Sequence, residues 1–386
     1  MNVPIEDLYE AYFACRRNKR RSAAAVEFEL RYEDYLSELC RELNDGSYRP
    51  GPMRAFIVRN PVLREVFAPQ FRDRVVHHYL MRRLLQAFEA ELINDTYSCR
   101  VGKGTLYGLQ RLQEQALACA KANPHRRVYV LKLDIQAFFM SIDRQRLFLL
   151  VSQAIDRHYH EADADFLRHL CQLIIFSDPT DGCSRHSPPA LWRQLPADKS
   201  LFGQAPGRGL PIGNLTSQVF ANIYLNPLDR FVLAQPGVQG YGRYVDDFYI
   251  ISTDHRLLRR LIPKLRKFLR RELGLRLHPH KVYLQPYSHG VPFVGGVAKG
   301  QRLYIGNRTK GNAHAAICRH NANLRAAQCQ QKEPNWRAFL ASVNSYFGLI
   351  VHFRAWRIRR HLIRLIDHDW WRYVHSSRGY LRPGRK

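Results

Sequence analysis

Apolar residues recur three or four positions apart over much of the chain, with polar and charged residues between them. This period is typical of amphipathic helices, in which one apolar stripe faces a core. It predicts helices within the stretches 5–43, 71–92, 144–175, 213–232, 255–274 and 308–366. The sequence NDGSYRPGP at 44–52 should end the first stretch, which we expect to form one or two helices.

Shorter segments have the features of strands. The sequence MRAFIVRNPVLREVFAP predicts two short strands joined by a turn at Asn60-Pro61, and RRVYVLKLDIQAFFMSID predicts a buried strand that runs into a turn. GRYVDDFYIIS at 242–252 predicts a strand, a turn and a strand, and similar chemistry returns at 275–306. Together with the helices, these segments predict an α+β fold.

Two segments lack a regular period. Residues 176–208 are rich in proline, glycine and serine, and such a long irregular segment in a compact domain is usually functional or mobile. The C-terminal sequence SSRGYLRPGRK is basic, and we expect it to form a disordered tail.

Charge narrows the range of partners. The chain has 386 residues, and its 60 Lys and Arg against 33 Asp and Glu give a net charge of +27. Such a charge favours a polyanionic partner, so nucleic acid is the first expectation and an anionic membrane surface the second. Because the chain has neither a long apolar run nor an N-terminal signal-peptide core, we expect a cytoplasmic protein with no membrane partner. The eight cysteines never form C-x-x-C, so neither a zinc site nor a disulfide framework is indicated.

Two adjacent carboxylates interrupt an apolar segment. Asp246 and Asp247 in GRYVDDFYIIS would each be costly to bury without a compensating partner. A solvated turn is the ordinary interpretation, but the flanking residues are too apolar for a free loop. Neighbouring side chains of a strand point to opposite faces, so both can address one site only at the tip of a hairpin. Asp134, at the end of another buried strand, would complete a site for two Mg²⁺ ions about 3.5–4 Å apart, as in polymerases and nucleases.

Five segments, in order, resemble the motifs of reverse transcriptases. LDIQAFFMSID, GLPIGNLTSQVFANIYL and GRYVDDFYIIS resemble motifs A, B and C, and LHPHKVYL and VPFVGG resemble motifs D and E. The resemblance implies a right-hand polymerase fold with fingers, an antiparallel-sheet palm and a helical thumb. It divides the chain into an N-terminal helical extension at 1–48, fingers at 49–125, a palm at 126–300 with a fingers-side insertion near 144–208, a thumb at 301–370 and a basic tail at 371–386.

The same resemblance implies roles for particular residues. Asp134, Asp246 and Asp247 correspond to the catalytic, metal-binding aspartates, and the backbone carbonyl of Ile135 to a further ligand of Mg²⁺, for which Mn²⁺ can substitute. Lys281 corresponds to the motif D lysine that protonates the leaving pyrophosphate, with a solvated lysine as the alternative.

The nucleotide-binding residues implied by the resemblance lie in the fingers and in motifs A and B. Phe139 corresponds to the aromatic gate that excludes a 2′-hydroxyl, with ordinary core packing as the alternative. Arg64 corresponds to the residue that clamps the triphosphate, with Arg59 a second candidate; an exposed arginine is the alternative for both. Ile212 stands where most reverse transcriptases have the glutamine of PQG, and it offers bulk without a hydrogen bond. Gly213 indicates a close backbone approach to a ligand, which would keep position 212 near the substrate.

Further segments suggest a subfamily. GLPIGNLTSQ, FRDRVVHH, DTYSCRVGKGT and DKSLF are similar to sequences in the reverse transcriptases of diversity-generating retroelements. Those enzymes copy a template-repeat RNA with errors opposite adenines, and the cDNA replaces a variable repeat in a target gene. The resemblance implies template RNA, cDNA and dNTPs as ligands, and a small, oligomeric, basic accessory variability protein as partner. The alternatives are an antiphage-defence, retron-like or group II intron-like reverse transcriptase, and an RNA-binding scaffold without activity, which the three intact aspartates oppose.

A basic segment near the C-terminus is a candidate nucleic-acid contact. Arg354, Arg357 and Arg360 alternate with aromatic and aliphatic residues. This pattern fits a thumb helix that packs on one side and binds a phosphate backbone on the other, with a solvated basic face as the alternative.

Overall fold

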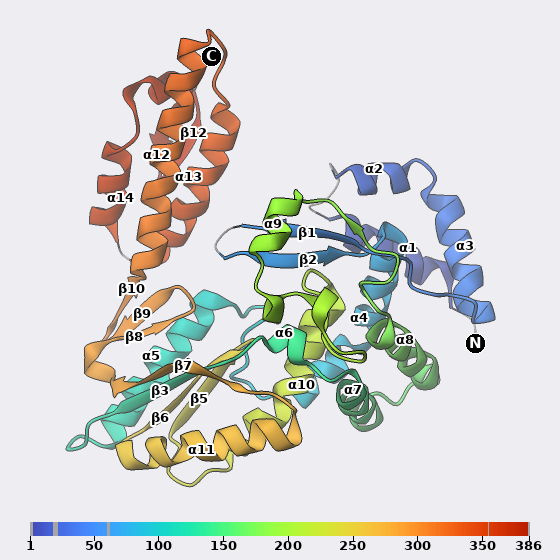
Figure 1. Ribbon diagram of the computed structural model, residues 1–386. Coiled ribbons are helices and arrows are strands. Elements are labelled where there is room, and N and C mark those ends of the chain that lie inside the picture. Colours follow the sequence, from blue (N-terminus) through green and yellow to red (C-terminus); the bar gives the residue numbers. More distant parts are fainter. Residues whose placement is uncertain (1–2, 18–21, 60–61, 354, 385–386) are drawn as a thin grey trace.

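A four-stranded antiparallel sheet, called the central sheet because helices cover both of its faces, lies in the lower part of the computed structural model as drawn in Figure 1. The structure describes all residues except 1–2, 18–21, 60–61, 354 and 385–386. Its strands are β3 (Tyr129–Ile135), β5 (Gly240–Tyr244), β6 (Asp247–Ser252) and β7 (Leu277–Pro286), in the order β5-β6-β3-β7. Strand β3 pairs with both β6 and β7, so segments more than 100 residues apart form one sheet. The predicted α+β class and antiparallel sheet are confirmed.

Helices cover both faces of this sheet. Because side chains alternate along a strand, one face contributes Leu131, Leu133, Phe248 and Ile250 to a first apolar core, and the other contributes Val130, Tyr249 and Ile251 to a second. Among the helices that contribute to the first core are α4 (Phe71–Glu91), α7 (Arg144–His158), α8 (Ala164–Phe176), α10 (Leu215–Leu233) and α11 (His255–Glu272). Helix α5 (Thr105–Ala122) packs on the second. Both central strands are therefore buried, which explains their apolar sequences.

A smaller three-stranded sheet is built mainly from the segment that precedes α4 in sequence. Strands β1 (Arg54–Val58) and β2 (Arg64–Ala68) form the predicted hairpin, whose predicted turn at Asn60-Pro61 lies outside the described residues. Strand β4 (Ser184–Arg185), from the proline-rich segment, adds to β1 in parallel. The segment 176–208 is thus tied to the β1–β2 hairpin, and it also contains α9 (Pro189–Gln194) and the 3₁₀ turns η1 (Ala197–Lys199) and η2 (Leu201–Gly203).

Two helical predictions need correction in their boundaries. The first stretch forms three helices, α1 (Ile5–Arg16), α2 (Ala23–Glu29) and α3 (Tyr32–Asp45), and the left-handed Gly46 ends α3 where the sequence indicates a break. The stretch 144–175 forms α7 and α8 instead of one helix. The interruption allows the two helices to pack on each other, which a single straight helix could not do.

The C-terminal part is helical, as predicted, and stands apart from the β1–β2 hairpin in Figure 1. A three-stranded sheet of β8 (Val291–Phe293), β9 (Gly296–Lys299) and β10 (Arg302–Ile305) follows η3 (Tyr287–His289) and leads into it. The helices are α12 (Asn307–Cys329), α13 (Trp336–Ile350) and α14 (Trp356–Arg364), with 3₁₀ turns η4 (Val351–Phe353) and η5 (His368–Arg372).

The predicted disordered tail is wrong for the residues that the structure describes. Strands β11 (Val374–Ser377) and β12 (Tyr380–Pro383) form a hairpin on α13. Leu381 is buried there, and the Asn344 side chain forms hydrogen bonds with both its backbone N–H and its carbonyl at 2.8 Å. One buried leucine and a paired backbone therefore order a segment that its composition alone assigns to a tail.

Among the helices of the described residues, none combines the length and the apolar character that a membrane span requires.

Candidate active site

The paired aspartates lie at the tip of the β5–β6 hairpin, as predicted. Strand β5 ends at Tyr244 and β6 begins at Asp247, so the loop between them is Val245 and Asp246. Val245 has a φ of 55°, which costs a β-branched residue about 1–3 kcal/mol. A strained loop of two residues turns the chain between the aspartates and frees Asp246 from the alternation of the strand.

Asp134 lies directly beside this tip. It is the cross-strand partner of Asp247 in the β3–β6 pairing. The next residue, Ile135, donates its backbone N–H to the carbonyl of Asp246 at 3.3 Å. Three acidic residues from two segments of the chain are thus brought together at one end of the sheet.

Burial and mutual repulsion favour the neutral forms of two of these carboxyl groups. Burial, followed by the negative charge of Asp134, raises the pKa of Asp246 to about 6. Burial also raises the pKa of Asp247 to about 6, although the nearby Lys132 ammonium acts in the opposite direction. Carboxylates with raised pKa values that lie together need a cation to hold them in the charged form.

Two lysines supply positive charge in this structure. The Lys281 ammonium, from β7, lies 3.0 Å from both carboxylate oxygens of Asp134. The Lys132 ammonium lies 3.4 Å from Oδ2 of Asp247. The prediction that Lys281 lies at the site is therefore supported by its contact. Lys132 was missed, although its position two residues before Asp134 puts both side chains on the same face of β3.

The donor set suits a hard cation such as Mg²⁺. Within the described part of the chain, no three His, Cys, Asp or Glu side chains form a group that could hold a metal ion as they stand. However, Oδ1 of Asp247 is buried and has no hydrogen-bond partner, and the other donors nearby are carboxylate oxygens. A buried oxygen without a partner is unfavourable unless a ligand completes it, so these residues fit a divalent cation.

Phe139 lies near this end of the sheet, on the short helix α6 (Phe138–Ser141), which follows β3 directly. Phe138 is buried in the first core, whereas Phe139 is only partly buried. The Phe139 carbonyl accepts a hydrogen bond from the Leu210 N–H at 2.8 Å, which joins α6 to the start of the GLPIGN segment. Both phenylalanines contact the first core, and they differ in how deeply they are buried.

The GLPIGN segment packs against the β1–β2 hairpin. The Ile212 carbonyl accepts a hydrogen bond from Phe67 N–H at 2.8 Å, and its side chain packs on a small apolar cluster. Gly213 has a φ of +120°, and a Cβ on it would lie 2.7 Å from the Phe67 carbonyl oxygen. The glycine is therefore required by contact with β2. The inference that Gly213 approaches a ligand needs this correction, because the protein's own backbone accounts for the signal.

Arg64 and Arg59 lie on the β1–β2 hairpin and are exposed. Arg64 begins β2 opposite Val58, and Arg59 follows β1. Neither forms an ion pair with a described residue, so both guanidinium groups are free to bind an anion.

The basic candidates of the C-terminal part lie elsewhere. Arg357 and Arg360 are exposed on α14, each with its guanidinium carbon 6.0 Å from the centre of the Trp356 ring. Arg354 lies outside the described residues. Helix α14 is on the side of the C-terminal part that faces away from the β1–β2 hairpin (Figure 1), so the structure does not bring these residues to the aspartates.

A buried ion pair holds the hairpin tip, and sequence reasoning missed it. Arg243 and Asp229 are both fully buried and form a bidentate pair with distances of 2.7 and 2.6 Å. Another nitrogen of the same guanidinium donates to the Val245 carbonyl at 3.0 Å. The pair therefore links α10 to the strained loop that carries Asp246. The sequence feature that could have indicated this pair is the charged Arg243 in an otherwise buried strand.

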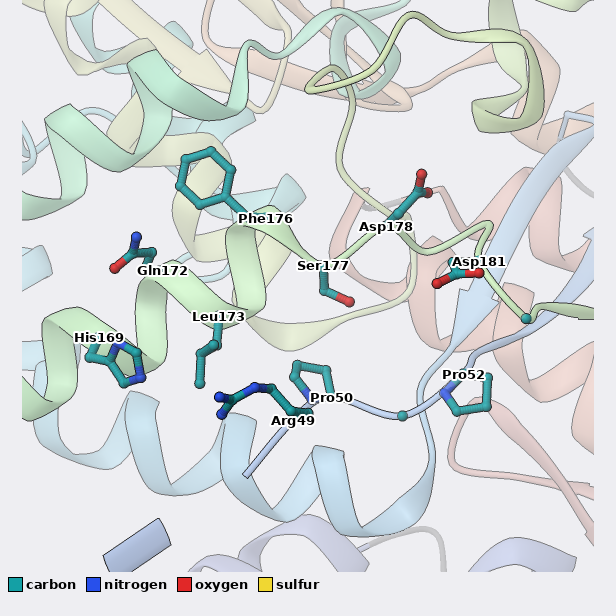
Figure 2. Close-up of a pocket in the computed structure, with 12 residues that line it drawn as sticks. Arg49, Pro50, Pro52, His169, Gln172, Leu173, Phe176, Ser177, Asp178 and Asp181 are labelled. Atoms are coloured by element: carbon teal, nitrogen blue, oxygen red, sulfur yellow. The ribbon is translucent and has the colours of Figure 1, made fainter. Parts of the chain in front are cut away.

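Figure 2 shows a pocket of about 640 Å³. It is formed by residues 49–52 and by the end of α8 with the turn that follows. Asp178, one of its two acidic residues, accepts hydrogen bonds from the backbone N–H and hydroxyl of Thr180. None of the predicted site residues lines this pocket, so it is separate from the candidate active site.

Comparisons with known proteins identify a matching family and a curated relative. Residues 63–297 match the family model described as reverse transcriptase (RNA-dependent DNA polymerase). Protein YkfC of Escherichia coli (strain K12) is 22% identical over 309 residues, which cover 70% of this chain and 71% of that protein.

Solved structures show a similar fold. The apo telomerase of Candida tropicalis aligns with a TM-score of 0.50 at 12% identity, covering 88% of this chain and 68% of that one. A form of that telomerase truncated from the C-terminal domain aligns with a TM-score of 0.49 at 12% identity and covers 69% of this chain. This chain spans 59% of the truncated telomerase chain. The predicted right-hand polymerase fold is confirmed. Because the family match covers more than half of the chain and includes all three aspartates, the protein belongs to the reverse transcriptase (RNA-dependent DNA polymerase) family.

Proposed function

We propose that Asp134, Asp246 and Asp247 catalyse the copying of a template RNA into cDNA. The observation that carries this proposal is the meeting of the three carboxyl groups at the hairpin tip, with Oδ1 of Asp247 buried and unpaired. These residues, with the Ile135 carbonyl, would hold two Mg²⁺ ions. When bound, such ions lower the pKa of an attacking hydroxyl and neutralise charge on a leaving pyrophosphate.

Two lysines support this assignment through their contacts. Lys281 neutralises Asp134 through two hydrogen bonds, and Lys132 does the same for Asp247 through one. We propose that Lys281 leaves Asp134 when the nucleotide binds and donates a proton to the leaving pyrophosphate. An ammonium group with three hydrogens and a flexible stem can perform both tasks.

We further propose that the nucleotide is selected largely by shape. Phe139 would pack beneath the sugar and exclude a 2′-hydroxyl, and Arg64, with Arg59, would bind the triphosphate. Ile212 would border the incoming base. The partial burial of Phe139, the free guanidinium groups of the hairpin and the apolar surroundings of Ile212 support this division of roles.

The biological role that we propose is error-prone copying in a diversity-generating retroelement. Its support is the motif resemblance around GLPIGN, together with Ile212, which has no amide to bond the incoming nucleotide. A site that lacks a polar contact discriminates less strongly against a wrong base. The cDNA would then replace part of a target gene, with a basic accessory protein as partner. An antiphage-defence, retron-like or group II intron-like enzyme would use the same chemistry without this error pattern.

Sequencing of cDNA made on a defined RNA tests this role. We expect errors concentrated opposite template adenines, and we expect Ile212→Gln to reduce those errors more than errors opposite the other bases, because glutamine restores a hydrogen-bonding group. Total cDNA yield is the control for loss of folding. Equal error spectra in both enzymes would show that Ile212 does not affect fidelity. An absence of adenine bias in the parent would favour the alternative enzymes.

A further inference from the structure

Helix α11 concentrates positive charge on one outer surface of the molecule. Its 18 residues contain eight Arg and Lys and one Glu, so it contributes +7 of the total charge of +27. The basic residues are all exposed: Arg256, Arg259, Arg260, Lys264, Arg266, Lys267, Arg270 and Arg271. We call this set the α11 basic face.

The apolar side of α11 is fully used in the core. Leu258, Leu261, Leu265 and Leu269 are buried, and Phe268 stacks on Phe231 with ring centres 4.2 Å apart. A basic amphipathic helix can insert into a membrane only if its apolar side is free. The α11 basic face therefore has the chemistry of a polyanion contact without that of membrane insertion.

Local acidic residues neutralise little of this charge. Among the described residues, Asp254 lies 3.9 Å from Arg260 and Glu272 lies 3.4 Å from Arg271, and both pairs are exposed. Among the residues that the structure describes, no other ion pair involves the α11 basic face. Solvent screens the two exposed pairs, so most of the charge remains available to a partner.

Further basic residues extend the face at both ends. At the C-terminal end of α11, Arg146 donates to the Arg271 carbonyl at 3.1 Å, and Arg208 lies close to Gly274. At the other end, Arg126 and Arg256 line the same shallow depression. The helix itself is about 27 Å long at 1.5 Å per residue, so the surface can contact several successive phosphates of a duplex.

The position of α11 separates this face from the active site. Figure 1 shows α11 on the outer side of the central sheet, with the β1–β2 hairpin and the C-terminal helices on the opposite side. The three aspartates lie at one end of the sheet, and none of the residues of the basic face contacts them. A nucleic acid bound on α11 would therefore be a second contact, outside the region where a primer and template are held.

We propose that the α11 basic face binds a double-stranded segment of the template RNA molecule, outside the part that is copied. The assignment to RNA rests on the proposed function, in which the long nucleic acid that the enzyme must recruit is its template. Guanidinium and ammonium groups without base-reading partners bind the phosphate backbone, so recognition would follow shape and charge more than sequence. The contact would hold the RNA on the enzyme while the primer end moves through the active site.

The test fills the active site first. The full chain is saturated with a short primer–template, and an RNA duplex of about 20 base pairs, closed by loops at both ends, is then titrated by fluorescence anisotropy. The variant carries Arg259→Gln, Lys267→Gln and Arg270→Gln. We expect its affinity for the closed duplex to fall by about tenfold or more, and the slope of log K against log salt to decrease by about 2 to 3. Extension of the short primer–template should be unchanged.

A matched control separates a local contact from loss of net charge. The control variant carries Arg31→Gln, Arg41→Gln and Lys121→Gln, which remove the same charge at exposed positions. Arg31 directly precedes α3, Arg41 lies on α3 and Lys121 lies on α5. This variant should bind the closed duplex like the parent. Equal affinity of the α11 variant and the parent would overturn the proposal, as would displacement of the primer–template by the closed duplex. Tighter binding of a closed DNA duplex would overturn the assignment to RNA. Primer extension by the parent reports the proposed function separately.

Discussion

The carboxyl group of Asp246 lies in surroundings that favour its neutral form, and a measurable cost in stability follows. Its pKa is raised to about 6 by burial and by the charge of Asp134, whereas an aspartate in an unfolded chain has a pKa near 4. The folded protein therefore holds a proton that the unfolded chain releases. The contribution of the Asp246 carboxyl group to the free energy of unfolding is fully present below about pH 4 and is lost as the pH rises through about 6.

We predict that Asp246→Asn stabilises the metal-free protein at pH 7.5. The amide cannot ionise, so the free energy of unfolding in EDTA should rise by about 1–3 kcal/mol, and the gain should disappear near pH 4. Urea unfolding at both pH values measures it. Mg²⁺ should stabilise the parent more than the variant, which retains two of the three carboxylates.

The control for this prediction is Asp198→Asn, which removes an exposed carboxylate from η1. It should change stability little at either pH. A destabilised Asp246→Asn protein at pH 7.5 would contradict the electrostatic description of the site.

Sequence reasoning at the scale of residues succeeds where a residue type has one main use. Adjacent aspartates in an apolar strand require a cation, and the structure brings Asp134 to them. Gly213 shows the limit, because a glycine signals close contact without identifying the neighbour, which here is the Phe67 carbonyl. Lys132 could have been found from strand alternation, since it precedes Asp134 by two positions.

The joint between the GLPIGN segment and β2 depends on this glycine. Gly213→Ala would place a Cβ 2.7 Å from the Phe67 carbonyl oxygen at a φ of +120°. We predict a loss of about 1–3 kcal/mol in the free energy of unfolding, measured in urea. Gly203→Ala is the matched control, because a Cβ there meets nothing within 4 Å. Similar losses in both variants would show that the contact of Gly213 with the Phe67 carbonyl does not explain the lost stability.

The β5–β6 hairpin depends on α10 through the pair of Arg243 and Asp229. Breaking a buried ion pair costs about 3–5 kcal/mol, because the remaining charge is left without compensation. We predict a loss of this size for Arg243→Met in urea unfolding, together with a lower rate of nucleotide incorporation. The double variant Arg243→Met/Asp229→Leu should recover much of the stability.

The double variant also separates positioning from folding. The Val245 carbonyl would still lack its donor, so the loop that carries Asp246 should be less well held. We expect kcat to stay low in the double variant while KM for the nucleotide changes little. Recovery of both stability and kcat would show that Arg243 serves folding alone.

Elements were predictable where their apolar period is long. The strands of the central sheet and α11 follow from local sequence, because burial on two faces or on one stripe leaves a clear pattern. Local sequence did not predict the break between α7 and α8, nor did it predict the β11–β12 hairpin. Each depends on contacts with distant segments, such as that of Asn344 with Leu381, which a local pattern does not contain.

At the scale of the whole molecule, the order β5-β6-β3-β7 assembles the site. Strand β3 enters between two strands that follow it by more than 100 residues, and only this order places Asp134 beside Asp247. Local sequence could not predict that neighbour relation, whereas the ordered motifs implied it through their resemblance to reverse transcriptases. The net charge of +27 is consistent with a nucleic-acid substrate along several surfaces, of which α11 is one.

Single-nucleotide incorporation on a primed RNA template tests the central claim most directly. The parent should extend the primer in the presence of Mg²⁺, and Asp246→Asn should lower the rate by about 10³-fold or more while affinity for the primed RNA stays within about twofold. The folded state of the variant is checked by its urea unfolding. Retained synthesis by a folded Asp246→Asn protein would contradict catalysis at the hairpin tip.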